Sequence, residues 1–222
     1  MIAPSKILTP TIVYGNDPLC GWCFAIGPEL LKARLELADE VAFRIECGGL
    51  VMSERVRPIA HDRDYLAAGF ARVKATSGRE PGPNYWSRVV EPGIWVSNSE
   101  PACRAVLVAQ KMEPGRAIEF SHALTDALYV DGELPDDPST VRRVAEDVGI
   151  NADELFSLWS SPDAATLTAN AFAHARQLGV TSYPSLYLEV GSRLKPILSG
   201  FATTDEIVSE IRTVIAVSRD GS

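Results

Sequence analysis

Two cysteines three residues apart, Cys20 and Cys23, are the residues of this 222-residue chain best suited to covalent chemistry. Cysteines at this spacing on a helix share one face, so their sulfurs can reach disulfide-bonding distance. The pair follows a short β-forming run and opens a helical pattern. At a helix N-terminus, unpaired N–H groups and the helix dipole stabilise a thiolate, which is the nucleophile of thiol–disulfide exchange. We therefore expect Cys20 to be the catalytic nucleophile and Cys23, one turn further, to be the resolving thiol.

Two unreactive cysteines are one alternative for a CxxC motif, although they would be expected in mid-helix rather than at a strand-to-helix junction. Half of a zinc site is another alternative, and it needs a second pair of ligands. Cys47, Cys103 and the three histidines occur singly, without a second CxxC or an HxxxH pattern. We expect no metal and no cofactor beyond a redox-active Cys20–Cys23 disulfide. Cys47 and Cys103 are expected to pack in the core, with an approach of Cys103 to the active-site groove as the alternative. Glu46 is expected on a solvated strand face, and its alternative is a buried proton acceptor for Cys23.

The first 50 residues read as a β-α-β unit that would position the pair. Residues 10–14 form a predicted strand, residues 20–38 a helix kinked near Pro28, and residues 41–47 a second strand. Such a unit implies two parallel strands joined by a right-handed crossover. At the other end of the chain, residues 185–190 and 196–199 have a hairpin pattern, and residues 203–206 cap a final helix.

The middle of the chain carries helical patterns only, at residues 100–112, 116–128, 139–148, 152–160 and 164–178. Removing this part leaves β-α-β followed by β-β-α. The sequence therefore predicts an α/β fold in which residues 1–52 and 179–222 form one discontinuous domain. Residues 53–178 would be an all-helical insertion domain.

The segment Asp17-Pro18-Leu19-Cys20-Gly21-Trp22-Cys23 resembles the active-site segment of the DsbA-like thiol:disulfide oxidoreductases, a branch of the thioredoxin superfamily. The likeness extends to Gly179-Val180-Thr181-Ser182-Tyr183-Pro184, and it implies a thioredoxin-like fold with a helical insertion. Families of this fold place a cis-proline at the position of Pro184, beside the cysteine pair. A trans-proline beginning an edge strand is the alternative.

The same resemblance implies where substrates bind. The backbone of Tyr183 beside Pro184 would pair with an extended substrate chain, as in strand addition. Trp22 would shape a surface groove for substrates, with plain packing as its alternative. Within the superfamily the chain looks most similar to the FrnE-like group, which has stretches like Ser97-Asn98-Ser99 and Ala102-Cys103-Arg104.

Composition excludes several other classes of function. Hydrophobic residues make up 46% and charged residues 23%, as in ordinary globular proteins, and the net charge is −8 without a basic run. A nucleic-acid partner would need clustered Lys and Arg, so we expect none. No apolar stretch approaches the roughly 20 residues that span a bilayer. Pro4 and Pro10 stand where a signal peptide would need an unbroken apolar core, so we expect a cytoplasmic chain whose cysteines start as thiols.

These expectations combine into a disulfide oxidoreductase or isomerase that works through a mixed disulfide. Its partners would be protein or small-molecule thiols and disulfides, with glutathione as a co-substrate. One alternative is a glutathione-dependent enzyme resembling 2-hydroxychromene-2-carboxylate isomerase and the kappa-class transferases, which typically carry a lone serine at the nucleophile position. Another is a redox-silent module whose insertion groove holds a peptide.

Overall fold

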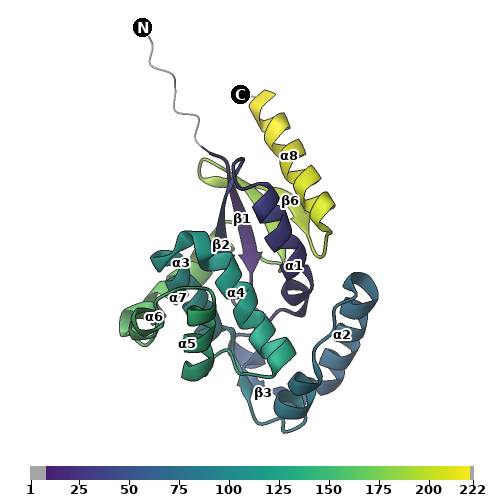
Figure 1. The fold of residues 1–222 in the computed structure, drawn as a ribbon, viewed down its shortest axis with the longest axis vertical. Helices are drawn as coiled ribbons and strands as arrows, with labels where there is room; N and C mark the ends of the chain where they lie inside the picture. The colour runs from purple at the N-terminus through teal and green to yellow at the C-terminus, as the bar shows by residue number, and fades with distance from the viewer. Residues whose placement is uncertain (1–8, 221–222) are drawn as a thin grey trace.

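A computed structural model describes residues 9–220 of the chain (Figure 1). The signal-peptide interpretation and the ends of the predicted first domain, residues 1–8 and 221–222, lie outside the described part. Within residues 9–220, no helix combines the length and the apolar character that crossing a membrane requires.

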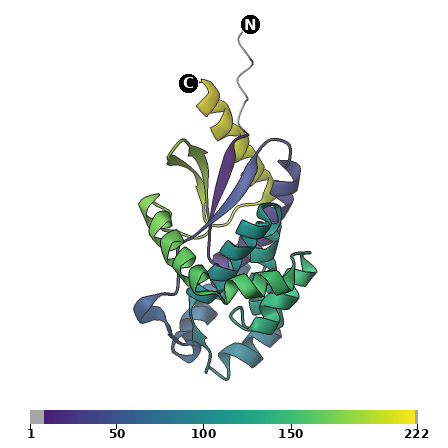
Figure 2. The ribbon, with the colours of Figure 1, turned by 90° about the vertical axis from the view of Figure 1, so that its left-hand side faces the viewer.

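Four strands form the central sheet, in the order β2-β1-β5-β6. They are β1 (Thr11–Asn16), β2 (Ala42–Cys47), β5 (Ser185–Val190) and β6 (Arg193–Ser199). β1 runs parallel to β2 and antiparallel to β5, and β5 and β6 form an antiparallel hairpin beside them (Figure 2). Ile12 and Val13 in β1 are fully buried, because this central strand is covered on both faces. The predicted β-α-β and hairpin units are therefore confirmed.

Helices α1 (Gly21–Glu36) and α8 (Thr204–Asp220) lie side by side (Figure 1). The Glu29 carboxylate accepts hydrogen bonds from the backbone N–H of Thr204 at 3.0 Å and from its hydroxyl at 2.6 Å. Thr203 and Glu206 complete the predicted capping box, since each side chain bonds the other residue's backbone N–H. Pro28 lies inside α1, which continues through it.

The middle of the chain is mainly helical, as predicted. Its elements are η1 (Ser53–Arg55), β3 (Arg57–Pro58), η2 (Ile59–Asp62), α2 (Arg63–Ser77), η3 (Tyr85–Val90), β4 (Val96–Ser97), α3 (Ser99–Met112), η4 (Pro114–Arg116), α4 (Ala117–Asp126), η5 (Ala127–Asp131), α5 (Pro138–Asp147), α6 (Ala152–Trp159) and α7 (Pro162–Gln177). The two-residue strands β3 and β4 pair with each other, so this segment is not wholly helical. All four strands of the central sheet come from outside residues 53–178. The division into two domains stays a prediction.

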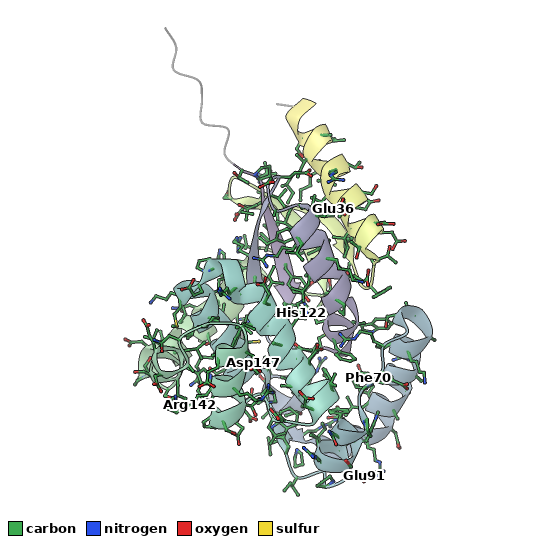
Figure 3. The ribbon with its side chains drawn as sticks, viewed as in Figure 1. Glu36, Phe70, Glu91, His122, Arg142 and Asp147 are labelled. Carbon is green, nitrogen blue, oxygen red and sulfur yellow. The ribbon has the colours of Figure 1, made fainter. Side chains whose placement is uncertain are left out.

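An aromatic cluster joins α1 to the helical segment. It consists of Phe24, Phe70, Tyr85, Trp86 and Tyr129, whose neighbouring rings lie with centroids 5.0 to 6.4 Å apart. Phe70 on α2, labelled in Figure 3, packs edge-on against Phe24 of α1. The Arg79 guanidinium lies 3.8 Å from the centre of the Phe24 ring and pairs with Asp126 at 3.0 Å. These contacts hold the first turns of α1, and with them the cysteine pair.

Candidate active site

Cys20 stands at the junction between β1 and α1. The chain leaves β1 at Asn16 and turns through Asp17, and the Cys20 N–H donates to the Asp17 carbonyl at 3.0 Å. Cys20 then caps α1 in an extended conformation, with φ −89° and ψ 115°. Its side chain is 4% exposed, whereas Cys23, in the first turn of the helix, is fully buried. Of the two sulfurs, Cys20 is therefore the one that reaches the surface.

The loop before β5 brings Tyr183 and Pro184 against the pair. The Tyr183–Pro184 peptide bond is cis, as the resemblance implied, and the Cys20 thiol donates to the Tyr183 carbonyl at 3.4 Å. Gly15 in β1 permits this approach, because a Cβ there would stand 2.3 Å from the hydroxyl of Ser185. The Tyr183 ring extends over Gly48, where a Cβ would lie only 1.7 Å from the phenol oxygen. Trp22 is half-buried and packs on the core.

The surroundings of Cys20 and Cys23 shift the pKa values of the two thiols in opposite directions. A hydrogen bond from the Cys23 thiol lowers the pKa of Cys20, helped by the N–H groups of Cys23 and Trp22 and opposed by burial and by the Asp17 charge. Burial and the neighbouring Cys20 sulfur raise the pKa of Cys23 well above the ordinary value for a thiol. We expected the helix N-terminus to dominate. The Cys23 thiol contributes more, since it donates directly to the Cys20 sulfur.

Two buried rings lie behind Cys23. Tyr14 of β1 stacks on His122 of α4 with ring centroids 5.7 Å apart, and the nearby Tyr14 phenol acts to lower the Cys23 pKa against the larger effect of burial. Figure 3 labels His122 on α4, which packs against α1. Burial lowers the pKa of His122 to about 3, so the imidazole is neutral near pH 7. This ring packs without adding a charge beneath the sulfurs.

A buried carboxylate anchors the loop that carries Cys20. The Asp17 side chain is fully buried and accepts hydrogen bonds from the N–H groups of Leu19 at 2.9 Å and Leu50 at 2.6 Å. It also accepts one from the Ser99 hydroxyl at 3.0 Å and a longer one from the Cys103 thiol at 3.6 Å. Burial raises the pKa of Asp17, although each of these donors acts to lower it. The segments that contain Asp17, Ser99 and Cys103 stand out in the sequence, but no pattern indicates that residues more than 80 positions apart bind each other.

The comparison with family models decides the family. Residues 87–212, more than half of the chain, match the DSBA-like thioredoxin domain. The chain belongs to this family. None of the curated proteins matches the chain. The narrower FrnE-like assignment stays a prediction.

Solved structures of other DSBA-like and related proteins share the fold. A putative protein disulfide isomerase from Nitrosomonas europaea is 24% identical, with a TM-score of 0.79 over 94% of this chain and 98% of that one. The cytosolic disulfide reductase DsbM from Pseudomonas aeruginosa is 23% identical, with a TM-score of 0.76 over 93% and 99%. A 2-hydroxychromene-2-carboxylate isomerase is 15% identical, with a TM-score of 0.60 over 95% and 97%. At these identities the likeness establishes the thioredoxin-like fold.

The remaining sequence candidates have structural positions of their own. Cys47 and Cys103 are fully buried in the core, as expected, and Cys103 additionally reaches Asp17. The expectation for Glu46 was wrong: its side chain is not solvated but buried, and it pairs with Arg44 and, at 3.2 Å, with His174 of α7. The described residues contain no cluster of three or more histidines, cysteines or carboxylates that could hold a metal ion.

Proposed function

We propose that this protein is a thiol–disulfide oxidoreductase in which Cys20 is the nucleophile and Cys23 the resolving thiol. The observation that carries the proposal is the asymmetry of the pair. Cys20 is the more exposed sulfur and has the lowered pKa, whereas Cys23 is buried beneath it with a raised pKa. The thiolate at the surface attacks the substrate disulfide first. The protonated thiol in the interior reacts only after the mixed disulfide has formed.

In the reducing direction, the Cys20 thiolate attacks one sulfur of a substrate disulfide. The substrate S–S bond breaks, a bond forms between Cys20 and the substrate sulfur, and the leaving thiolate takes up a proton. Cys23 then loses its proton and attacks the Cys20 sulfur, which releases the second substrate thiol. The substrate gains two electrons and two protons, and the Cys20–Cys23 disulfide must be reduced again by two external thiols, for which glutathione is suited.

The Tyr183 carbonyl supports a role for that residue in binding substrate. This carbonyl lies 3.4 Å from the Cys20 sulfur, and Tyr183 is half-buried. We propose that Tyr183, Pro184 and Trp22 form the rim on which a substrate chain lies during the exchange. A cytoplasmic location, where cysteine pairs are kept reduced, would favour reduction or isomerisation over net oxidation. The name of the relative DsbM, a cytosolic disulfide reductase, agrees with that direction.

Trapping of mixed disulfides tests the division of roles. The Cys23→Ser variant should accumulate mixed disulfides through Cys20, because the resolving thiol is gone. The Cys20→Ser variant is the matched control and should trap far less. Alkylation of the reduced protein at neutral pH, read by mass spectrometry, should label Cys20 first. Equal trapping by both variants, or first labelling of Cys23, would contradict the assignment.

Glutathione-dependent isomerisation is a second candidate, favoured by the fold shared with 2-hydroxychromene-2-carboxylate isomerase. This mechanism does not require Cys23, because an isomerase that only binds a glutathione thiolate needs no resolving thiol. Under this alternative, Cys23→Ser would retain turnover of an isomerase substrate. Under the leading proposal, the same variant loses catalytic turnover with disulfides.

A further inference from the structure

A cavity of about 480 Å³ opens beside Leu19, between the loop after β2, the start of α2 and the π-helical segments η3 and η5. Leu19, the residue before Cys20, forms part of its wall. Tyr129 is also in the wall, and its hydroxyl donates to the Leu19 carbonyl at 2.6 Å. The cavity is thus built onto the turn that holds the nucleophile. Its volume lies in the range of pockets that take small molecules, and it is too small for a folded chain.

The wall of this cavity is aromatic and apolar. Tyr65, Tyr85, Trp95 and Tyr129 contribute rings, and leucine and isoleucine side chains fill the spaces between them. Two of the polar tips already have partners: the Tyr129 hydroxyl bonds Leu19, and the Trp95 indole N–H donates to Asp136 at 3.0 Å. The surface left for a ligand is therefore mainly ring faces and methyl groups, which match a flat apolar body better than a polar peptide.

The charged groups of the wall are two guanidinium groups and one carboxylate. Arg55 and Arg57 line the cavity together with Asp62, and Arg57 pairs with that carboxylate. Arg55 donates to the Leu50 carbonyl at 3.3 Å, and no carboxylate within residues 9–220 forms an ion pair with it. A basic wall is unexpected in a chain of net charge −8. An exposed guanidinium at an apolar cavity is suited to bind a carboxylate through two parallel hydrogen bonds.

We propose that this cavity binds small aromatic disulfides, or the corresponding thiols, that carry a carboxylate, with Arg55 binding the carboxylate. The inference rests on the proposed function, because the bound disulfide would be reduced by the same pair. The S–S bond of the ligand breaks, Cys20 and Cys23 become the disulfide, and two aromatic thiols leave with the two electrons. The cavity would make small aromatic disulfides substrates in addition to protein chains lying along Tyr183.

Two aromatic disulfides, one anionic and one uncharged, test this assignment. 5,5′-Dithiobis(2-nitrobenzoate) carries a carboxylate on each ring, and 4,4′-dithiodipyridine is uncharged at pH 7.5. Stopped-flow measurement gives the second-order rate constant of the reduced protein with each reagent. The readout is the rate constant with the dinitrobenzoate disulfide divided by the rate constant with dithiodipyridine. Arg55→Gln should lower this ratio about tenfold, since a charge-assisted contact contributes about 1.4 kcal/mol or more. Arg72→Gln, which removes the same charge from an exposed site on α2 outside the cavity wall, should leave the ratio within twofold of the wild-type value.

A ligand without sulfur tests binding apart from the redox chemistry. 2-Nitrobenzoate should compete with the dinitrobenzoate disulfide for the wild-type protein, whereas 2-nitrobenzamide, which lacks the charge, should compete at least several-fold more weakly. An unchanged rate ratio in Arg55→Gln, or equal competition by acid and amide, would overturn the proposal. Competition by oxidised glutathione alone would also overturn it, because the occupant would then be a peptide. If Cys20→Ser reacts as fast as wild type with both disulfides, Cys20 is not the nucleophile and the proposed function fails. The rate ratio alone would not show this, because it compares the two reagents and not the two proteins.

Discussion

Replacing Asp17 with asparagine should destabilise the protein, although the two side chains have nearly the same shape. The carboxylate has two oxygens, and each accepts from one backbone N–H: Oδ1 from Leu19 and Oδ2 from Leu50. A carboxamide keeps only one oxygen, so its NH₂ group must face one of the two N–H donors. The carboxylate that binds both donors is fully buried, and a backbone N–H cannot turn away as a hydroxyl can.

The magnitude follows from the number of donors left without an acceptor. One buried N–H without a partner costs about 1–3 kcal/mol, so we expect Asp17→Asn to lower the free energy of unfolding by that amount. Asp17→Ala removes both oxygens and should cost about 2–6 kcal/mol, a large share of the roughly 5–15 kcal/mol of a typical domain. Urea unfolding at pH 7.5, followed by tryptophan fluorescence, gives these differences.

Asp39→Asn is the matched control, because it makes the same change of charge at an exposed position. We expect that variant to stay within about 0.5 kcal/mol of the wild type. Asp17→Asn also has a second readout: the Asp17 charge raises the pKa of Cys20, so its removal should move the onset of Cys20 alkylation to lower pH. An Asp17→Asn protein as stable as the Asp39 control would refute the role of the carboxylate as an anchor of the active-site turn.

Three further substitutions probe the thiols and the rings behind them. Cys23→Ala should raise the pKa of Cys20, seen as a shift of its iodoacetamide rate profile to higher pH, since the largest influence lowering that pKa is the Cys23 thiol. Tyr14→Phe should raise the pKa of Cys23 and slow the release of a thionitrobenzoate mixed disulfide at neutral pH; unchanged release would exclude the phenol from this step. The folded-state pKa of His122 is about 3 against an ordinary 6.5, so the folded protein resists binding this proton. The contribution of His122 to the free energy of unfolding is fully present above pH 6.5 and is lost as the pH falls towards 3, by up to about 1.4 kcal/mol per pH unit. His122→Phe should remove this contribution to the pH dependence of the free energy of unfolding between pH 6.5 and 3.

The parts of the fold that could be predicted from sequence are those with local signals. The strand pattern of β2, the hairpin pattern of β5 and β6 and the Thr203–Glu206 box all act between neighbouring residues, and each appears as predicted. Helix α2 lacks such a signal: it buries only Phe70 and Val73, and Tyr65 on the same helix is 72% exposed. Its position depends on ring contacts with residues outside the helix, which a periodic pattern does not contain.

The site shows the same limit. The CxxC motif could be identified from its spacing and its place after a strand, and Pro184 from the resemblance to the DsbA-like oxidoreductases. The alternation around Glu46 could not say that α7 would cover that edge of β2 and bring His174 to the carboxylate. Likewise, Asp17 carried no sign that its partners would come from α3. These contacts join segments far apart in the chain, and a single sequence does not specify which distant residues meet.

The fit of the Tyr183 ring over Gly48 has a consequence for the sequences of related proteins. Gly48, unlike its neighbour Gly49 with φ 73°, does not have the left-handed backbone that favours glycine, so space alone excludes a side chain there. The two positions should therefore vary together: a chain with alanine or a larger residue in place of Gly48 should have a residue smaller than tyrosine before the proline. An alignment in which tyrosine accompanies large residues at the Gly48 position as often as glycine would show that the loop absorbs the clash by moving.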